Sequence, residues 1–73
     1  MAKACVLIKT TPTASERVLE NVKEMKAVTK AYTAYGRWDV VALIDASMEE
    51  IGKLSGTINS LEGVRSSETL PEA

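Results

Sequence analysis

The residues best suited to chemistry lie in one short stretch, Tyr35-Gly36-Arg37-Trp38-Asp39. Gly36 can adopt a positive φ without steric cost, so the stretch is expected to turn between two antiparallel strands and to expose backbone amides. An ammonium group could be bound by the Asp39 carboxylate and a carboxylate by the free amides, a combination that a free amino acid requires. The same aspartate could instead cap the turn, and the sequence leaves this alternative open.

Catalytic chemistry finds little support in the residues. The chain contains no histidine, which is the usual general base near neutral pH. Asp39 and Asp45 would lie roughly 20 Å apart along a strand, too far to flank one bond. Ser66 and Ser67 have no nearby base to activate them, and no phosphate-binding loop is present. We therefore expect a protein that is not an enzyme.

Length and composition restrict the remaining possibilities. A single domain spanning residues 1–73 has a small core and usually needs help from disulfides, a metal or partner subunits. Cys5 is the only cysteine, which excludes an internal disulfide and, without an export signal, favours a reducing cytoplasm. No metal, no cofactor and no membrane span is expected, because the chain lacks histidine, calcium-loop spacing and a long apolar run. Oligomerisation is the expected source of extra stability.

The net charge of −1 is unevenly distributed along the chain. Residues 1–37 carry seven Lys or Arg against three Glu, whereas residues 38–73 carry two against seven acids. The overall acidity argues against a nucleic-acid surface. The two halves either interleave into a mixed solvated surface or orient contacts between copies of the chain.

Hydrophobic periodicity predicts the elements that position the turn. Residues 3–10 and the run from Trp38 to Asp45 are apolar on both faces, as central strands are. Residues 27–35 are more polar and predict a strand nearer an edge, and residues 64–70 predict a last strand that Pro71 ends.

Two capping boxes predict where the helices begin. Thr13 with Glu16, and Ser47 with Glu50, have the spacing at which a side chain at each position satisfies the other's backbone amide. Gly63 is expected to end the second helix as its C-cap. Each helix has one apolar stripe for packing on a sheet, formed by Val18, Leu19, Val22 and Met25 in the first and by Ile51, Leu54, Ile58 and Leu61 in the second.

The element order strand, helix, strand, strand, helix, strand predicts a ferredoxin-like α+β fold, βαββαβ, with four antiparallel strands and both helices on one face. The other face would be left uncovered, and a monomer seldom exposes a contiguous apolar patch of this kind. We therefore predict a homodimer in which two such faces pack together, with an interface formed by Cys5, Leu7, Val41 and Leu43. Gly52 and Gly56 interrupt the second helix, which close packing on the sheet or against a partner would explain.

Two motifs resemble those of a known family. The stretch from Tyr35 to Val41 resembles the Gly-x-aromatic-Asp motif of the Lrp/AsnC family, and Gly63-Val64-x-x-Ser67-x-Thr69 resembles its closing Gly-Val-x-x-Thr-x-Thr. The match covers essentially the whole chain and corresponds to the family's C-terminal effector-binding domain. The resemblance implies a dimeric α/β barrel in which two sheets face each other, and assembly of dimers into rings, from tetramer to decamer.

The same resemblance implies a small-molecule site between dimers, commonly for an amino acid. The ligand-facing positions carried over are Gly36, Arg37, Trp38 and Asp39 from the turn, with Ser67 and Thr69 from the last strand. Tyr35, beside the turn, is a further candidate by its position, and Ser67 stands where the family has threonine. Family regulators carry a helix-turn-helix domain ahead of this one, whereas this chain begins with its first strand, so a stand-alone domain without direct DNA binding is expected.

Three functions therefore remain open. The first, favoured by the two motifs, is an amino-acid-binding regulatory module of the Lrp/AsnC transcription-regulator family that acts by oligomerising, alone or with full-length relatives. The second is a purely structural assembly unit, which a saturable small-molecule site would exclude. The third is a small cofactor-free enzyme, because the same barrel architecture hosts such enzymes.

Overall fold

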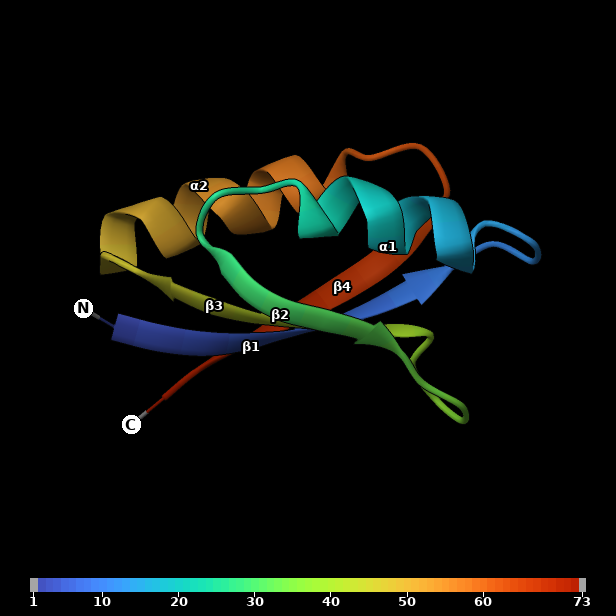
Figure 1. Ribbon diagram of the computed structural model, residues 1–73, viewed down its shortest axis with the longest axis horizontal. Helices are drawn as coiled ribbons and strands as arrows, with labels where there is room; N and C mark the ends of the chain where they lie inside the picture. The colour runs from blue at the N-terminus through green and yellow to red at the C-terminus, as the bar shows by residue number, and fades with distance from the viewer. Residues whose placement is uncertain (1, 73) are drawn as a thin grey trace.

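The computed structural model describes residues 2–72, which form a four-stranded antiparallel sheet with both helices on one face (Figure 1). The elements in chain order are β1 (Ala2–Thr10), α1 (Ser15–Lys23), β2 (Val28–Thr33), β3 (Val40–Ala46), α2 (Met48–Asn59) and β4 (Val64–Pro71). The strands lie side by side in the order β2-β3-β1-β4, so β1 and β3 are central and β2 and β4 are edges. The structure therefore confirms the predicted ferredoxin-like βαββαβ fold.

The register of β1 with its two neighbours decides which side chains share a face. Ile8 lies opposite Val40 and Ser67, and Cys5 lies opposite Leu43 and Leu70. Because side chains alternate along a strand, the even positions of β1 point toward the helices and the odd positions point away from them. The face without helices, here termed the open face, carries Lys3, Cys5, Leu7 and Lys9 of β1, Lys30 and Tyr32 of β2, Val41, Leu43 and Asp45 of β3, and Ser66, Glu68 and Leu70 of β4.

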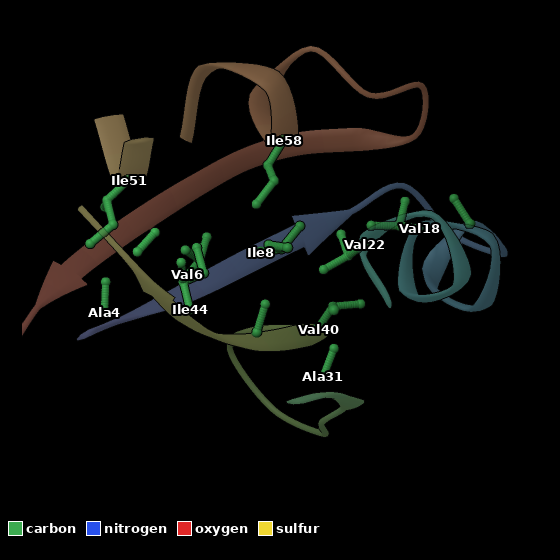
Figure 2. Packing of buried hydrophobic residues seen from close by; sticks show 13 residues of the cluster. Ala4, Val6, Ile8, Val18, Val22, Ala31, Val40, Ile44, Ile51 and Ile58 are labelled. Carbon is green, nitrogen blue, oxygen red and sulfur yellow. The ribbon is translucent and has the colours of Figure 1, made fainter. Parts of the chain in front are cut away.

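The hydrophobic core lies between the sheet and the two helices (Figure 2). Val18 and Val22 of α1 and Ile58 of α2 are fully buried, and Ile51 is nearly so. Burial of each such side chain contributes about 1.5–3 kcal/mol relative to exposure. The flanking residues Leu19, Met25, Leu54 and Leu61 are partly buried against the same cluster. Both apolar stripes predicted from the sequence are therefore confirmed.

Of the two predicted capping boxes, the structure contains one. The Ser47 hydroxyl accepts a hydrogen bond from the Glu50 amide at 3.1 Å, and the Glu50 carboxylate accepts one from the Ser47 amide at 3.4 Å. The box predicted at Thr13 and Glu16 is wrong, because α1 begins after Ala14 and has no side-chain cap. Thr13 instead lies in a turn with φ +72°, which removes its hydroxyl from the capping position.

Gly63 was expected to cap α2, and this prediction is wrong as well. The helix ends at Asn59, and Ser60 is its C-cap. Gly63 lies in the connection to β4 with φ +95°, and a Cβ there would lie 2.8 Å from the Cβ of Ala14. Its carbonyl accepts a hydrogen bond from the Thr11 amide at 2.9 Å. Glycine is therefore required here both by φ and by the contact between two connections.

Gly52 and Gly56 are not closely packed by other parts of the described chain. Both are exposed on α2, and apart from the adjoining residues and the nearby backbone of α2 itself, no atom of residues 2–72 lies within 4 Å of a Cβ placed at either position. Packing on the sheet therefore does not explain them, and contact with a partner remains a prediction.

The connection between β2 and β3 is longer than the predicted turn. β2 ends at Thr33 instead of Tyr35, and β3 begins at Val40 instead of Trp38. Residues 34–39 therefore form a loop, which we call the β2–β3 loop. The loop closes just beyond the β2–β3 ladder, where the Ala34 amide donates to the Asp39 carbonyl at 2.8 Å.

Candidate functional site

The β2–β3 loop lies at the end of the sheet opposite the two chain termini (Figure 1). Gly36 has φ +115°, which confirms the conformation expected for the turn glycine. Tyr35 is fully exposed, Gly36 and Arg37 are exposed, and Trp38 is half-buried. The loop thus presents an aromatic ring, a guanidinium group and bare backbone on the outside of the fold.

Asp39 ties this loop to β1 and does not cap the turn itself. Its Oδ2 accepts a hydrogen bond from the Thr10 amide at 2.9 Å, and its own amide donates to the Ile8 carbonyl at 2.9 Å. Its carbonyl accepts from the Ala34 amide at 2.8 Å and so closes the loop. Oδ1 accepts no hydrogen bond from residues 2–72, which leaves one carboxylate oxygen available at a fixed position.

The loop also carries backbone amides without partners. Those of residues 35–38 donate to no other residue in the described range, whereas the amides at both ends of the loop are bonded. Free amides in a turn attract anions. The Lys9 ammonium donates to the Arg37 carbonyl at 3.1 Å and adds positive charge beside them. The loop therefore holds exposed Tyr35, Gly36 and Arg37 next to half-buried Trp38 and Asp39.

Ser67 and Thr69 lie elsewhere in the same chain. Both are on β4, on the face that α2 covers. The Ser67 hydroxyl donates to Asn59 Oδ1 at 3.2 Å, and the Thr69 hydroxyl shares a 2.6 Å hydrogen bond with that of Ser55. Within one chain these hydroxyls are engaged by α2 and do not face the β2–β3 loop. Any contact of Ser67 or Thr69 with a ligand at that loop would therefore have to come from a neighbouring copy.

The residues predicted for a dimer interface lie together at the centre of the open face. Cys5 is paired with Leu43, and Leu7 with Val41. Leu43 is 37% exposed, and Cys5 and Leu7 are half-buried. The expectation that Val41 is open to water is wrong, because Val41 is only 9% exposed between its cross-strand neighbours.

Two exposed apolar residues of the open face were missed by the sequence prediction. Tyr32 of β2 and Leu70 of β4 are 43% and 47% exposed, and they extend the apolar patch to both edges of the sheet. The sequence did contain the information, because side chains alternate between the two faces of a strand. This alternation places Tyr32 and Leu70 on the face away from the helices. Only the pairing with central strands shows that they continue the same patch.

No group of three or more Cys, Asp or Glu side chains within residues 2–72 could hold a metal ion. None of the helices in that range is long and apolar enough to cross a membrane.

The fold defines a small domain of the ferredoxin-like class, and sequence comparison specifies its family. The Lrp/AsnC ligand binding domain family matches residues 3–71. The chain therefore belongs to this family, as the motifs around Gly36 and Gly63 predicted. No curated protein sequence matches the chain significantly.

Solved structures share the same architecture. A crystal structure of a Thermus thermophilus protein is 33% identical to the chain, with TM-score 0.94, and covers 100% of this chain and 94% of that one. A hypothetical protein from Pyrococcus horikoshii is 20% identical with TM-score 0.90, covering 100% and 90%. E. coli AsnC is 19% identical with TM-score 0.85, covering 97% of this chain and 50% of AsnC. The last two likenesses concern the fold alone.

Proposed function

We propose that this domain binds a free amino acid at the β2–β3 loop and acts as a regulatory module through oligomerisation. The observation that carries the proposal is the free Oδ1 of Asp39 beside the free amides of residues 35–38. Membership of a family described as a ligand binding domain supports it. A similar fold in a protein named as an AsnC family transcriptional regulator, from Agrobacterium tumefaciens, supports the regulatory part.

The two polar ends of an amino acid match the two kinds of group in the loop. The ammonium group would be bound by Asp39 Oδ1. Three hydrogen bonds, made by Oδ2, the amide and the carbonyl of Asp39, hold this residue in place. The carboxylate would be bound by the free amides of the loop, with Arg37 nearby as a second positive partner. The amino acid side chain would lie against Trp38 or Tyr35, whose rings offer apolar surface.

The proposed oligomer begins with a homodimer through the open face. Cys5, Leu7, Val41 and Leu43 form the centre of that interface, and covering their apolar surface supplies stability that a small core lacks. Dimers would assemble further into a ring, in which Ser67 and Thr69 of one copy could approach the loop of another. Full-length Lrp/AsnC relatives are alternative partners for the same contacts.

The direct test is a thermal-shift panel of the twenty amino acids on the wild-type protein. A ligand at 100 times its dissociation constant stabilises the folded state by about 2.7 kcal/mol, which raises the Tm of a domain of this size by several degrees. We expect a rise with one amino acid or one chemical class. A panel without any rise would contradict the proposal.

Asp39→Asn is the sharpest variant for this assay. Its amide oxygen can still accept from the Thr10 amide, whereas an NH₂ group replaces the free oxygen and opposes an ammonium. Glu20→Gln is the matched control, because it also replaces a carboxylate by an amide, on the exposed surface of α1. We expect the ligand-dependent rise to be lost in Asp39→Asn and kept in Glu20→Gln.

The open apolar face favours one second candidate, a purely structural assembly unit. In that case the oligomer would form without any ligand, and Asp39 would serve only to fasten the loop. A saturable rise in Tm that Asp39→Asn removes would exclude this candidate. A catalytic role is not proposed, and a turnover screen with the bound ligand would test that part of the proposal.

A further inference from the structure

Two positively charged side chains beside the β2–β3 loop have no acidic partner. The Lys9 ammonium donates to the Arg37 carbonyl at 3.1 Å, and Arg37 itself lies exposed in the loop. The ion pairs within residues 2–72 join α1 to the α2–β4 connection and one turn of α2 to the next, so neither cation takes part in one. Lys9 can donate two further hydrogen bonds and the Arg37 guanidinium five, so both can bind an anion.

The fold holds Lys9 in place. Lys9 is half-buried, whereas Lys3 on the same face of β1 is exposed. Its hydrogen bond fastens β1 to a residue 28 positions later in the chain. The amide of the next residue, Thr10, is fastened in turn to Asp39 Oδ2. An ammonium that is already ordered loses less side-chain entropy when it binds an anion, which favours binding.

The charges beside the loop do not balance. Lys9 and Arg37 supply two positive charges against the single negative charge of Asp39, so the group has a net charge of +1. The loop bends to the side of the sheet away from both helices, so the charged surfaces of α1 and α2 lie across the sheet from it (Figure 1). On β4, beyond β1, Arg65 and Glu68 have opposite charges that cancel.

We propose that the ligand of the loop is an acidic amino acid, aspartate or glutamate, and that Lys9 and Arg37 select it by binding its side-chain carboxylate. This inference rests on the proposed function and adds the chemical class of the ligand. In that function Asp39 Oδ1 takes the ammonium group and the loop amides take the α-carboxylate. A second carboxylate on the ligand then meets the two unpaired cations, and its net charge of −1 neutralises the group.

Ligands of other classes leave charges unmatched. A basic amino acid brings a third positive charge beside Lys9 and Arg37, which is unfavourable. A neutral amino acid leaves both cations without a partner. The rings of Tyr35 and Trp38 would contact the methylene groups of glutamate and of glutamine alike, so apolar contact does not separate an acid from its amide. Comparison of each acid with its amide therefore isolates the contribution of the two cations.

Isothermal titration calorimetry of the wild-type protein, near neutral pH and at low salt, tests the proposal. The probes are L-glutamate with L-glutamine, L-aspartate with L-asparagine, and L-leucine and L-lysine as representatives of other classes. One of the acids is expected to bind at least about 10-fold more tightly than its amide, because hydrogen bonds to charged groups are the stronger ones. High salt should reduce this advantage, since it screens the exposed charges.

Lys9→Gln tests the residue that the fold holds in place. Glutamine removes the charge but keeps a side-chain donor for the Arg37 carbonyl. The variant is expected to lower the affinity for the acid about 10-fold and to leave the affinity for its amide unchanged. Lys3→Gln is the matched control, because it makes the same change on the same face of β1 at its other end, and it should affect neither affinity.

Arg37→Glu tests the charge balance by inverting it. The net charge of the group changes from +1 to −1, and Arg37 is exposed, so the fold should tolerate the substitution. The variant is expected to bind L-lysine more tightly than L-glutamate, the reverse of the wild-type order. This variant also keeps the inference testable if Lys9→Gln does not fold.

The failure of this inference and the failure of the proposed function are distinguishable. Equal affinities for each acid and its amide, or tighter binding of leucine or lysine, would overturn the inference and leave the proposed function intact. Equal weakening of acid and amide in Lys9→Gln would mean that Lys9 only holds the loop, and an equal loss in Lys3→Gln would mean that its charge acts without contact. Absence of binding by all twenty amino acids would refute the proposed function itself.

Discussion

Asp39→Ala is expected to destabilise the fold because it removes the bond between the β2–β3 loop and β1. The carboxylate accepts from the Thr10 amide at 2.9 Å, and Thr10 is only 7% exposed. A hydrogen bond to a charged group contributes about 1.5–3 kcal/mol, and removal of the acceptor leaves a buried donor unsatisfied. Since Asp39 itself is half-buried and water can reach part of the site, we expect a loss of about 2 kcal/mol.

Asp39→Asn keeps an acceptor oxygen but loses the charge, so we expect a smaller loss of about 1 kcal/mol. Against a total stability of about 5 kcal/mol for a small domain, both changes are large enough to measure. Urea unfolding gives both values, provided that the protein concentration is held constant, because a dimer's stability depends on it.

The assay can separate the loop from the rest of the fold. Trp38 is the only tryptophan and adjoins Asp39, so its fluorescence reports on the loop, whereas far-ultraviolet circular dichroism reports on the whole domain. Coincident transitions at lower urea are expected for Asp39→Ala. Early loss of the fluorescence signal alone would mean that the loop detaches locally. Wild-type stability in both variants would refute the structural role of the Thr10–Asp39 hydrogen bond.

The remaining predictions concern backbone conformation and are measured by the same unfolding assay. Gly63→Ala should lower the free energy of unfolding by about 2 kcal/mol or more, because alanine there meets both the positive φ and the contact with Ala14. Gly36→Ala should lower it by only about 1 kcal/mol, because φ is its sole constraint. Equal losses of stability in the two variants would contradict the contact between Gly63 and Ala14. Gly52→Ala and Gly56→Ala should each stabilise by about 1 kcal/mol, because both lie exposed in α2; a loss of assembly instead would show that a partner packs there. Thr13→Gly should stabilise by about 1 kcal/mol, because threonine at φ +72° is strained; destabilisation would show that its side chain makes a contact worth more than that strain.

Much of the fold followed from local patterns in the sequence. Apolar runs on both faces identified the two central strands, and the helical stripes at Val18, Val22, Ile51 and Ile58 identified the core. The capping box at Ser47 and the loop glycine at Gly36 were also correct. These features depend on residues within a few positions of one another, so the sequence alone is enough to predict them.

The candidate site depended on contacts between distant residues. Asp39 could be proposed as a ligand group or a turn cap, but its bond to the Thr10 amide exists only once β3 lies beside β1. The roles of Ser67 and Thr69 likewise follow from their position under α2. Spacing along the chain does not specify such contacts, because they depend on how the strands pair.

The errors at the helix ends have the same origin. Thr13 has the sequence of a cap and Gly63 that of a helix terminus, but the connections around Thr13 and Gly63 pack against each other through Ala14. That contact sets the local backbone and overrides the local signal. Strand register acts in the same way, since a shift of one residue would move every side chain to the opposite face. Periodicity thus identifies which residues form each strand, and only packing determines which of them meet.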